Sequence, residues 1–288
     1  MLTSGSSMLG SPADFSPDQP PVASAGPVCA IHQPNLLPRL STVAKIFAAD
    51  VWIVLDDVQH NRRDYQHRAR LGFLHGQATR WLSLPTHLPA GRATLIRNAR
   101  LVNPAGSRRR VEGVLREQYR ASPFWPLFAE QLRPMLDLFD VTDRTAEITQ
   151  ASTMLLLDTL GWTGQVVRSS ELPAGAGRTQ RLVDLCRAVG ADTYLCGTGG
   201  SRYVEPGRFA GAGIELRWFA APGTGVWADS RSVSAVHALL LQGSAEVRQH
   251  LEAARSGSPA VVPPTRPHIL PTPSPRIGRF DLPAPPRR

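Results

Sequence analysis

Three polar residues near the start of the chain have side chains suited to binding or activating a small substrate: His32, Gln33 and Asn35. An imidazole can act as a general base near neutral pH, so His32 is a candidate catalytic residue. The amides of Gln33 and Asn35 donate and accept hydrogen bonds, which suits recognition of a polar ligand. Pro34 and Pro38 restrict the backbone around them. The alternative is a hydrogen-bonded loop that caps the following helix.

Two adjacent carboxylates, Asp56 and Asp57, follow the apolar run at 51–55 and are also candidate catalytic residues. Neighbouring residues of an extended chain point to opposite sides, so we expect different roles for the two. One could face the site as a base or as a ligand of Mg²⁺, which prefers oxygen ligands. The other could cap a helix or pair with Arg62 or Arg63. A structural ion pair is the alternative.

Four residues of the polar stretch that follows are candidates for substrate binding: Gln59, Arg62, Gln66 and Arg68. An arginine can clamp a phosphate or a carboxylate through two parallel hydrogen bonds. Such contacts would suit a nucleotide sugar or an acyl phosphate. The same residues could equally form a solvated face.

Two serines, Ser169 and Ser170, follow the strand predicted at 164–168. Their hydroxyl groups could bind a ligand or cap a helix. The strained G-x-S-x-G turn of α/β-hydrolases does not surround them, which argues against a Ser-His-Asp triad.

A glycine-rich loop follows the apolar run at 192–196. Gly197, Gly199 and Gly200 would let the backbone approach an anionic ligand closely and could adopt positive φ. Tyr203 could stack on that ligand or hydrogen bond to it. The loop matches neither the Walker A motif nor the complete dinucleotide-binding motif, so a simple tight turn is the alternative.

The apolar runs before these loops predict buried strands that alternate with helices. Strands are expected at 29–31, 51–55, 80–84, 94–102, 164–168, 192–196 and 214–219, and helices at 40–49, 107–120, 126–138, 143–160, 178–189, 201–211 and 231–253. Ser41 is a plausible N-cap of the first helix. The pattern predicts an α/β fold with a mostly parallel sheet, flanking helices and a central helical segment. Ligands bind beyond the carboxyl ends of such strands, where the polar loops stand.

Composition sets the boundaries of the predicted domain. Residues 1–28 are rich in Ser, Pro, Gly and Ala, and residues 257–288 are rich in Pro and Arg. Both segments are predicted to be disordered tails around one domain at 29–256. The N-terminus lacks the pattern of a signal peptide, and no apolar run approaches the roughly 20 residues that span a bilayer. We expect a cytoplasmic protein without membrane contact.

The net charge of +9 raises the question of nucleic acid binding. Zinc-finger spacing, RNP-type aromatic motifs and a basic heptad helix are missing from the sequence, so nucleic acid is not an expected partner. All but one of the 32 basic residues are arginine, the exception being Lys45, which is typical of a biased genome composition. The three cysteines lack metal-ligand spacing and are expected to be buried thiols. The sequence assigns neither a metal nor a cofactor.

Four motifs occur in one order over roughly residues 29–220: HQPNLLP (32–38), ADVWIVLDDVQHNRRDYQHRARL (49–71), SSEL (169–172) and TQRLVDLCRAVGADTYLCGTGGSRYV (179–204). With them the chain resembles the WbqC-like family. The resemblance implies a cytoplasmic tailoring enzyme of surface-polysaccharide or specialised-metabolite biosynthesis. It also implies a transferase, which would attach an acyl or aminoacyl group to an amino sugar or another small amine. The chain departs from the family at 39–42, where a Trp-Leu-Gly-Tyr-type segment is usual, and at 222–232, which lacks a Tyr-x-Gln-type motif.

Two other functions stay open at the level of sequence. The first is nucleotidyl transfer, which would require Mg²⁺ and ATP. The second is non-catalytic binding of a small molecule, or a role as a partner subunit. The expected partner of an enzyme or binding protein of this kind is a small polar or anionic molecule.

Overall fold

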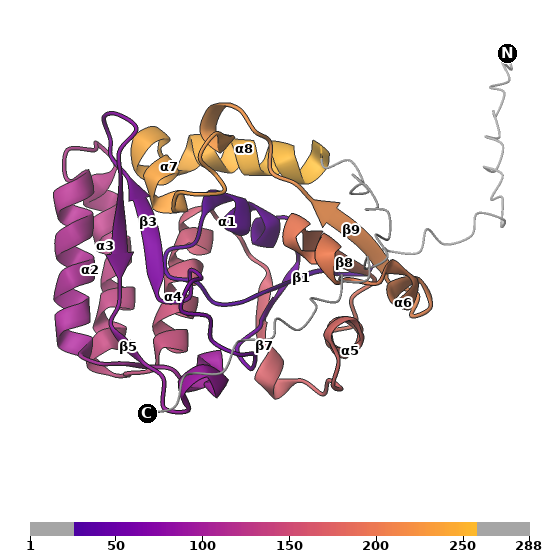
Figure 1. Cartoon of the computed structure of the whole chain (residues 1–288). Coiled ribbons are helices and arrows are strands. Elements are labelled where there is room, and N and C mark those ends of the chain that lie inside the picture. The colour runs from indigo at the N-terminus through magenta and orange to yellow at the C-terminus, as the bar shows by residue number, and fades with distance from the viewer. Residues whose placement is uncertain (1–25, 258–288) are drawn as a thin grey trace, which may run out of the picture.

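The computed structural model of the protein describes residues 26–257, which build on a central sheet of five parallel strands (Figure 1). In their order across the sheet the strands are β7 (Gln165–Arg168), β2 (Val51–Val54), β1 (Val28–His32), β8 (Thr193–Gly197) and β9 (Glu215–Phe219). All four pairings are parallel. Short apolar runs form these strands because helices cover both faces of the sheet. The predicted α/β fold is confirmed.

The order of the strands reverses next to β1. The chain runs from β1 to β2 and then to β7 on one side, and later places β8 and β9 on the other side. The crossover loops that leave β1 and β8 therefore diverge in opposite directions at the carboxyl ends of these two strands. In open parallel sheets this topological switch point is where ligands bind.

Helices cover both faces of the sheet. They are α1 (Leu40–Phe47), α2 (Pro104–Tyr119), α3 (Trp125–Asp137), α4 (Thr145–Thr159), α5 (Arg178–Ala188), α6 (Pro206–Ala210), α7 (Ala235–Gln242) and α8 (Ser244–Gly257). Trp52 and Val54 of β2 belong to the larger apolar cluster, together with residues of α1, α4, α7 and α8. Val51 and Ile53 point to the opposite face and pack with α5 and α6. The alternation along β2 thus divides the core into two layers.

A second group of elements lies beside the sheet. The antiparallel strands β3 (Arg68–Gly72) and β4 (Thr79–Ser83) pair with each other, as do the short strands β5 (Thr86–His87) and β6 (Arg100–Leu101). Figure 1 shows β3 together with α2 and α3 on the side of the molecule away from β8 and β9. Gln118 of α2 donates a hydrogen bond of 2.8 Å to the carbonyl oxygen of Gly72, which links α2 to the end of β3.

Several local predictions differ from the structure. The helix α1 begins without a side-chain cap after Arg39, and Ser41 lies inside it. The strand predicted at 94–102 is a 3₁₀ turn at Ile96–Asn98 followed by the two residues of β6. The strand β3 was missed because two of the five residues in its sequence, RARLG, are charged. Gly243, with φ of +86°, divides the helix predicted at 231–253 into α7 and α8.

The predicted tails fall almost wholly on residues 1–25 and 258–288, which lie outside the described residues. Residues 26–28 do belong to the folded part: the amide of Gly26 hydrogen bonds to Asp192, and β1 begins at Val28. Among the helices of residues 26–257, none has the length and apolar character needed to cross a membrane.

Candidate functional site

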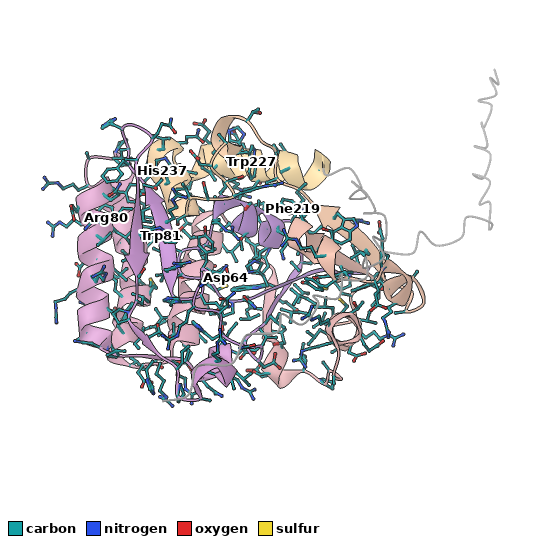
Figure 2. All side chains as sticks on the ribbon, viewed as in Figure 1. Asp64, Arg80, Trp81, Phe219, Trp227 and His237 are labelled. Carbon is teal, nitrogen blue, oxygen red and sulfur yellow. The ribbon has the colours of Figure 1, made fainter. Side chains whose placement is uncertain are left out.

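A pocket of about 440 Å³ opens at the switch point between β1 and β8. Its wall comes from the loop after β1, the first two turns of α1, the loop after β8 and the segment after β9. Asp64 and Phe219 of this wall lie on different elements, in the loop before β3 and at the end of β9 (Figure 2). The volume lies within the range of small-molecule sites. We call it the switch-point pocket.

The loop between β1 and α1 is held in a strained shape. Leu37 has φ of +40°, and it is the one non-glycine residue with positive φ in the described part of the chain. The hydroxyl of Ser152 on α4 accepts a hydrogen bond of 2.9 Å from the amide of Leu37 and donates to the carbonyl oxygen of Asn35. Thr153 donates to the same carbonyl. Strain of this kind persists where surrounding contacts fix it, and it clusters at functional sites.

His32 lines the pocket as a neutral imidazole. Burial, and secondarily the charges of Lys45 and Arg39, lower the pKa of His32 to about 3. Its Nδ1 lies 2.8 Å from the carbonyl oxygen of Gln33, which can only accept, so the ring proton sits on Nδ1. Nε2 is therefore a hydrogen-bond acceptor. The low pKa makes His32 a weaker base than an unperturbed histidine.

Lys45 reaches the pocket from α1 and is 6% exposed. Its Nζ donates a hydrogen bond of 2.9 Å to the carbonyl oxygen of Ile31 in β1. Burial lowers the pKa of Lys45 to about 8, although the nearby sulfurs of Cys196 and Cys29 offset part of the effect. A substantial fraction of this amine is therefore neutral near physiological pH, which is unusual for lysine.

The loop after β8 forms the opposite wall as a short 3₁₀ helix, Thr198–Arg202. None of Gly197, Gly199 and Gly200 uses the positive φ that the sequence allowed. A Cβ at Gly200 would lie 2.3 Å from the sulfur of Cys196, whereas one at Gly199 would meet nothing within 4 Å. Gly200 is required by packing, and Gly199 leaves the wall open. Tyr203 completes this wall.

The pocket is positively charged overall. Arg39, Lys45 and Arg231 line it against a single carboxylate, that of Asp64. Two buried polar atoms of its lining residues, Nε of Arg39 and Oδ1 of Asn35, have no hydrogen-bond partner among residues 26–257. One is a donor and the other an acceptor. An anionic ligand would supply the acceptor that Nε of Arg39 lacks, and an N–H or O–H group of the ligand would supply the donor that Oδ1 of Asn35 lacks.

Comparison with known proteins places the chain in a family. The profile of the WbqC-like protein family matches residues 33–248, which include all lining residues of the switch-point pocket except Ile31 and His32. The chain belongs to the WbqC-like family. A relative from Mycobacterium tuberculosis, the uncharacterized protein Rv1507c, is 24% identical over 230 residues, which cover 78% of this chain and 98% of the relative. No solved structure matches the chain.

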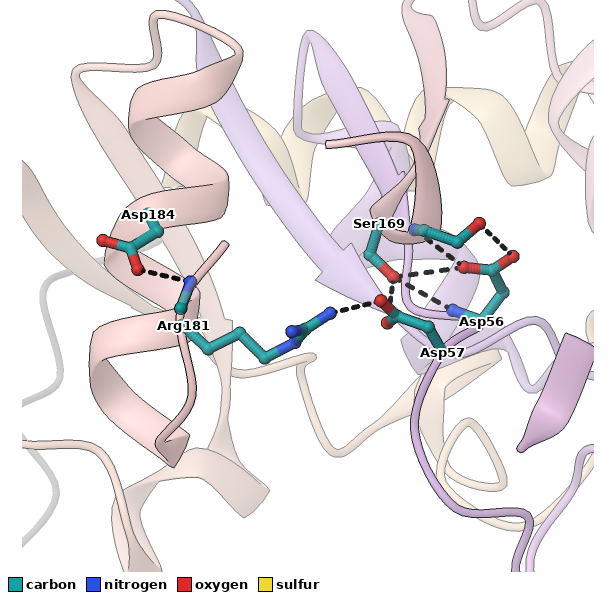
Figure 3. Close-up of polar contacts among 7 residues, drawn as sticks. Asp56, Asp57, Ser169, Arg181 and Asp184 are labelled. Carbon is teal, nitrogen blue, oxygen red and sulfur yellow. Dashed lines mark hydrogen bonds and ion pairs between the residues drawn. The ribbon is translucent and has the colours of Figure 1, made fainter. Parts of the chain in front are cut away.

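The two aspartates predicted as catalytic residues lie in a polar network of this WbqC-like protein, outside the switch-point pocket (Figure 3). Asp56 is 5% exposed and accepts hydrogen bonds from the amide and the hydroxyl of Ser170, at 3.1 and 2.8 Å. Asp57 accepts from the Ser169 hydroxyl at 2.6 Å and forms an ion pair with Arg181 of α5. The five residues tie the carboxyl ends of β2 and β7 to α5.

Electrostatics support a structural role for this network. Burial acts to raise the pKa of Asp57, but hydrogen bonds from Ser169 and Arg181 and the arginine charge outweigh it and hold the pKa below its usual value. Asp57 is therefore ionised and paired at neutral pH. Within residues 26–257 no three His, Cys, Asp or Glu side chains form a group that could hold a metal ion.

The candidates from the polar stretch lie in other places. Gln66 is buried and joins the loops by donating to Oε1 of Gln33 at 2.8 Å. Arg68 donates to the carbonyl oxygens of Asp64 and Arg63 and stacks on Trp81, and the latter side chain is labelled in Figure 2. Gln59 donates to the carbonyl oxygen of Arg92. Arg62 lines a different pocket, described below.

Of the fifteen predicted site residues, the structure brings seven into the switch-point pocket: His32, Gln33, Asn35, Gly197, Gly199, Gly200 and Tyr203. Sequence reasoning missed Arg39, Lys45 and Arg231. The sequence did contain a signal for Lys45. It is the one charged residue of the mostly apolar helix LSTVAKIF, and a helix of this composition is expected to be buried together with its lysine.

Proposed function

We propose that this WbqC-like protein is a transferase that attaches an acyl or aminoacyl group to an amino sugar or another small amine, within polysaccharide or specialised-metabolite biosynthesis. The observation that carries the proposal is the buried Lys45 amine beside the imidazole of His32 at the switch point. Amine acylation needs a group that accepts a proton near neutral pH. The cytoplasm is the compartment that the family resemblance implies.

The chemistry assigns a role to each group. The attacking amine forms a bond to the carbonyl carbon of the donor, and the bond from that carbon to the leaving group breaks. The neutral amine of Lys45 takes the proton that the attacking nitrogen loses and later releases it to solvent. It keeps its hydrogen bond to Ile31, because a neutral amine still has two N–H bonds. Nε2 of His32 accepts a hydrogen bond from the substrate amine and orients it.

Charge in the pocket favours an anionic substrate. Arg39 and Arg231 flank Lys45 in the wall and would bind a carboxylate or a phosphate of the donor or the acceptor. The Arg39 side chain is already fixed, since its guanidinium lies 4.2 Å from the centre of the Tyr65 ring and donates to the carbonyl oxygen of Arg231. A fixed side chain loses little entropy on binding.

The test is a ligand screen followed by assay of turnover. Thermal unfolding of the full chain is measured with nucleotides, nucleotide sugars and acyl donors, with and without Mg²⁺. A ligand at about 100 times its Kd stabilises the fold by roughly 2.7 kcal/mol, a shift of a few degrees. Mass spectrometry then follows amide formation from the best donor and a panel of amines.

The variants Lys45→Met and Arg63→Ala make a matched pair for this screen, because Arg63 is exposed and lines neither pocket described here. We expect Lys45→Met to lose amide formation and Arg63→Ala to keep it. Pyrophosphate exchange with ATP and Mg²⁺ would instead indicate nucleotidyl transfer. Binding without any turnover would indicate a binding protein.

A further inference from the structure

A second pocket, of about 330 Å³, lies beside β4 and the start of α2 and shares no lining residue with the switch-point pocket. Its polar lining consists of His60, Arg62, His67, Ser83, Thr86 and Arg110. We call it the histidine pocket. The polypeptide between β2 and β3 separates the two sites, since Asp64 lines the first and its neighbours line the second.

Two imidazoles in this pocket have no protein partner. His60 is 5% exposed, and both of its ring nitrogens are buried without a hydrogen bond to any described residue. Nδ1 of His67 is in the same condition, and the two ring centroids lie 5.3 Å apart. A buried polar group that lacks a partner costs about 1–3 kcal/mol, so folded proteins rarely leave two such groups side by side. These nitrogens are suited to hydrogen bond to a ligand.

The charges of the pocket select the kind of ligand. Arg62 and Arg110 are both exposed and permanently positive, and no carboxylate lines the pocket in the described part of the chain. Burial lowers the pKa of His60 to about 4, with further lowering by His67 and Arg62 and partial compensation by Asp64. Burial, Arg68 and Arg62 lower the pKa of His67, again against Asp64. A metal cation would be repelled by the arginines, whereas an anion with several oxygens would be attracted.

We propose that the histidine pocket binds a phosphoryl group, either as free phosphate or as the ester of an organic molecule. Arg62 and Arg110 neutralise its charge, and the N–H groups of His60 and His67 donate to its oxygens. A phosphoryl group presents at least three oxygens and up to two negative charges to these four side chains, whereas a carboxylate presents two oxygens and one charge. The proposed transferase function is not needed for this site, so either can fail alone.

Binding of a dianion should be linked to proton uptake. The charge of the ligand would raise the pKa of both histidines, which are neutral in the free protein near pH 7. The groups that face them are Arg62, Arg68 and Asp64 from their own loop and Arg110 from α2. Sulfate, which stays a dianion between pH 6 and 8, should therefore bind more tightly as the pH falls through this interval.

Titration calorimetry on the full chain tests the site with inorganic phosphate and phenyl phosphate as probes, at constant ionic strength set by chloride. We expect Arg62→Ala and Arg110→Ala each to weaken binding about tenfold, as loss of a charge-assisted hydrogen bond predicts. Their sequence neighbours Arg63→Ala and Arg109→Ala, both exposed and outside the pocket, should bind as the wild type does. His60→Phe keeps an aromatic ring in the core but should remove most of the pH dependence of sulfate binding, measured in the same way between pH 6 and 8.

Each outcome decides the question. Tighter binding of phenyl phosphate than of phosphate assigns the pocket to an organic ester, and equal binding assigns it to free phosphate. The proposal is overturned if phosphate binds no more tightly than chloride. It is also overturned if Arg63→Ala and Arg109→Ala weaken binding as much as Arg62→Ala and Arg110→Ala do. Loss of binding in Lys45→Met with full binding in Arg62→Ala overturns it as well, because this pattern would put the phosphate in the switch-point pocket.

Discussion

Nζ of Lys45 donates a hydrogen bond of 2.9 Å to the carbonyl oxygen of Ile31. This contact joins the first helix to the last apolar residue of β1, one residue before His32. It fixes the amine of the only lysine in the chain at the switch point of the sheet. The fold thus brings together a buried amine, a neutral imidazole and a wall that carries two arginines.

Lys45 should control the pH dependence of amide formation. Because only the neutral amine can accept a proton, the rate should rise with pH and level off above about 8, the pKa that burial imposes. Lys45→Met should remove this rise and most of the rate. The measurement is the pH profile of kcat/KM for both proteins. A wild-type rate that does not change between pH 6 and 9 would contradict the role of Lys45.

The same residue should also make the stability of the fold rise with pH. The pKa of Lys45 is lower in the folded protein than in the unfolded chain, where it is near 10.5. The unfolded state therefore binds more protons between about pH 8 and 10.5, and Lys45 makes folding more favourable as the pH rises through this interval. We expect wild type to gain stability relative to Lys45→Met across it, as measured by urea unfolding. A constant difference would indicate an unperturbed amine.

The ion pair between Asp57 and Arg181 should stabilise the fold above the pKa of Asp57. Asp57→Asn should lower the free energy of unfolding at pH 7 by roughly 2 kcal/mol, because Arg181 then loses its charged partner. The pKa of Asp57 is depressed, so this contribution is lost as the pH falls through that lowered value. Urea unfolding at pH 7 and at a series of acidic pH values measures both effects.

The surface pair of Arg100 and Asp143 provides the control for that experiment. Both side chains are more than 40% exposed, so Asp143→Asn should change stability by less than about 1 kcal/mol. An equal loss in Asp57→Asn and Asp143→Asn would show that the network at the ends of β2 and β7 is not a special support of the fold.

Two adjacent glycines of the switch-point pocket should respond differently to alanine. The methyl group of Gly200→Ala would collide with the sulfur of Cys196, so we expect a loss of about 1–3 kcal/mol. Gly199→Ala should keep its stability, since its methyl group would enter open space. It should instead weaken substrate binding by narrowing the pocket. Thermal unfolding and ligand titration of the pair separate packing from binding; reversed results would contradict the assignment.

Ser152 should support the loop that carries Asn35. Ser152→Ala leaves the buried amide of Leu37 without its acceptor, which should cost about 1–3 kcal/mol and weaken substrate binding. Ser256→Ala, at an exposed position of α8, should change stability by less than about 0.5 kcal/mol. Both variants are compared with the wild type by urea unfolding. If the free energy of unfolding of Ser152→Ala equals that of the wild type, the conformation of the strained loop does not depend on Ser152.

Much of the fold could be predicted because its signals are local. Apolar runs identified all five strands of the sheet, and Gly161, with φ of +76°, follows α4 where the sequence predicted the end of a helix. Local sequence patterns did not predict the elements whose structure depends on tertiary contacts. The charged strand β3 forms because β4 and α2 pack against it, and the sequence RARLG itself contains no pattern that predicts a strand.

The candidate site was predicted in part for the same reason. His32 and Asn35 stand at the end of a strand and in the loop after it, the glycine loop stands at the end of another, and the topology brings the ends of β1 and β8 together. Asp56 also follows a strand, β2, but β2 lies between β1 and β7 and does not adjoin β8. Asp56 therefore lies away from the switch point. The order of strands in the sheet, which single-sequence patterns do not contain, decides between these outcomes.

The most direct test of the site is the pKa of Lys45, measured by NMR on full-length protein labelled with ¹⁵N-lysine. The single lysine gives one side-chain signal without any assignment. We expect a pKa near 8 in the free protein, and a higher value when an anionic substrate or analogue from the ligand screen is bound. A pKa near 10.5 that no ligand changes would contradict a buried, substrate-facing amine, and with it the proposed transferase.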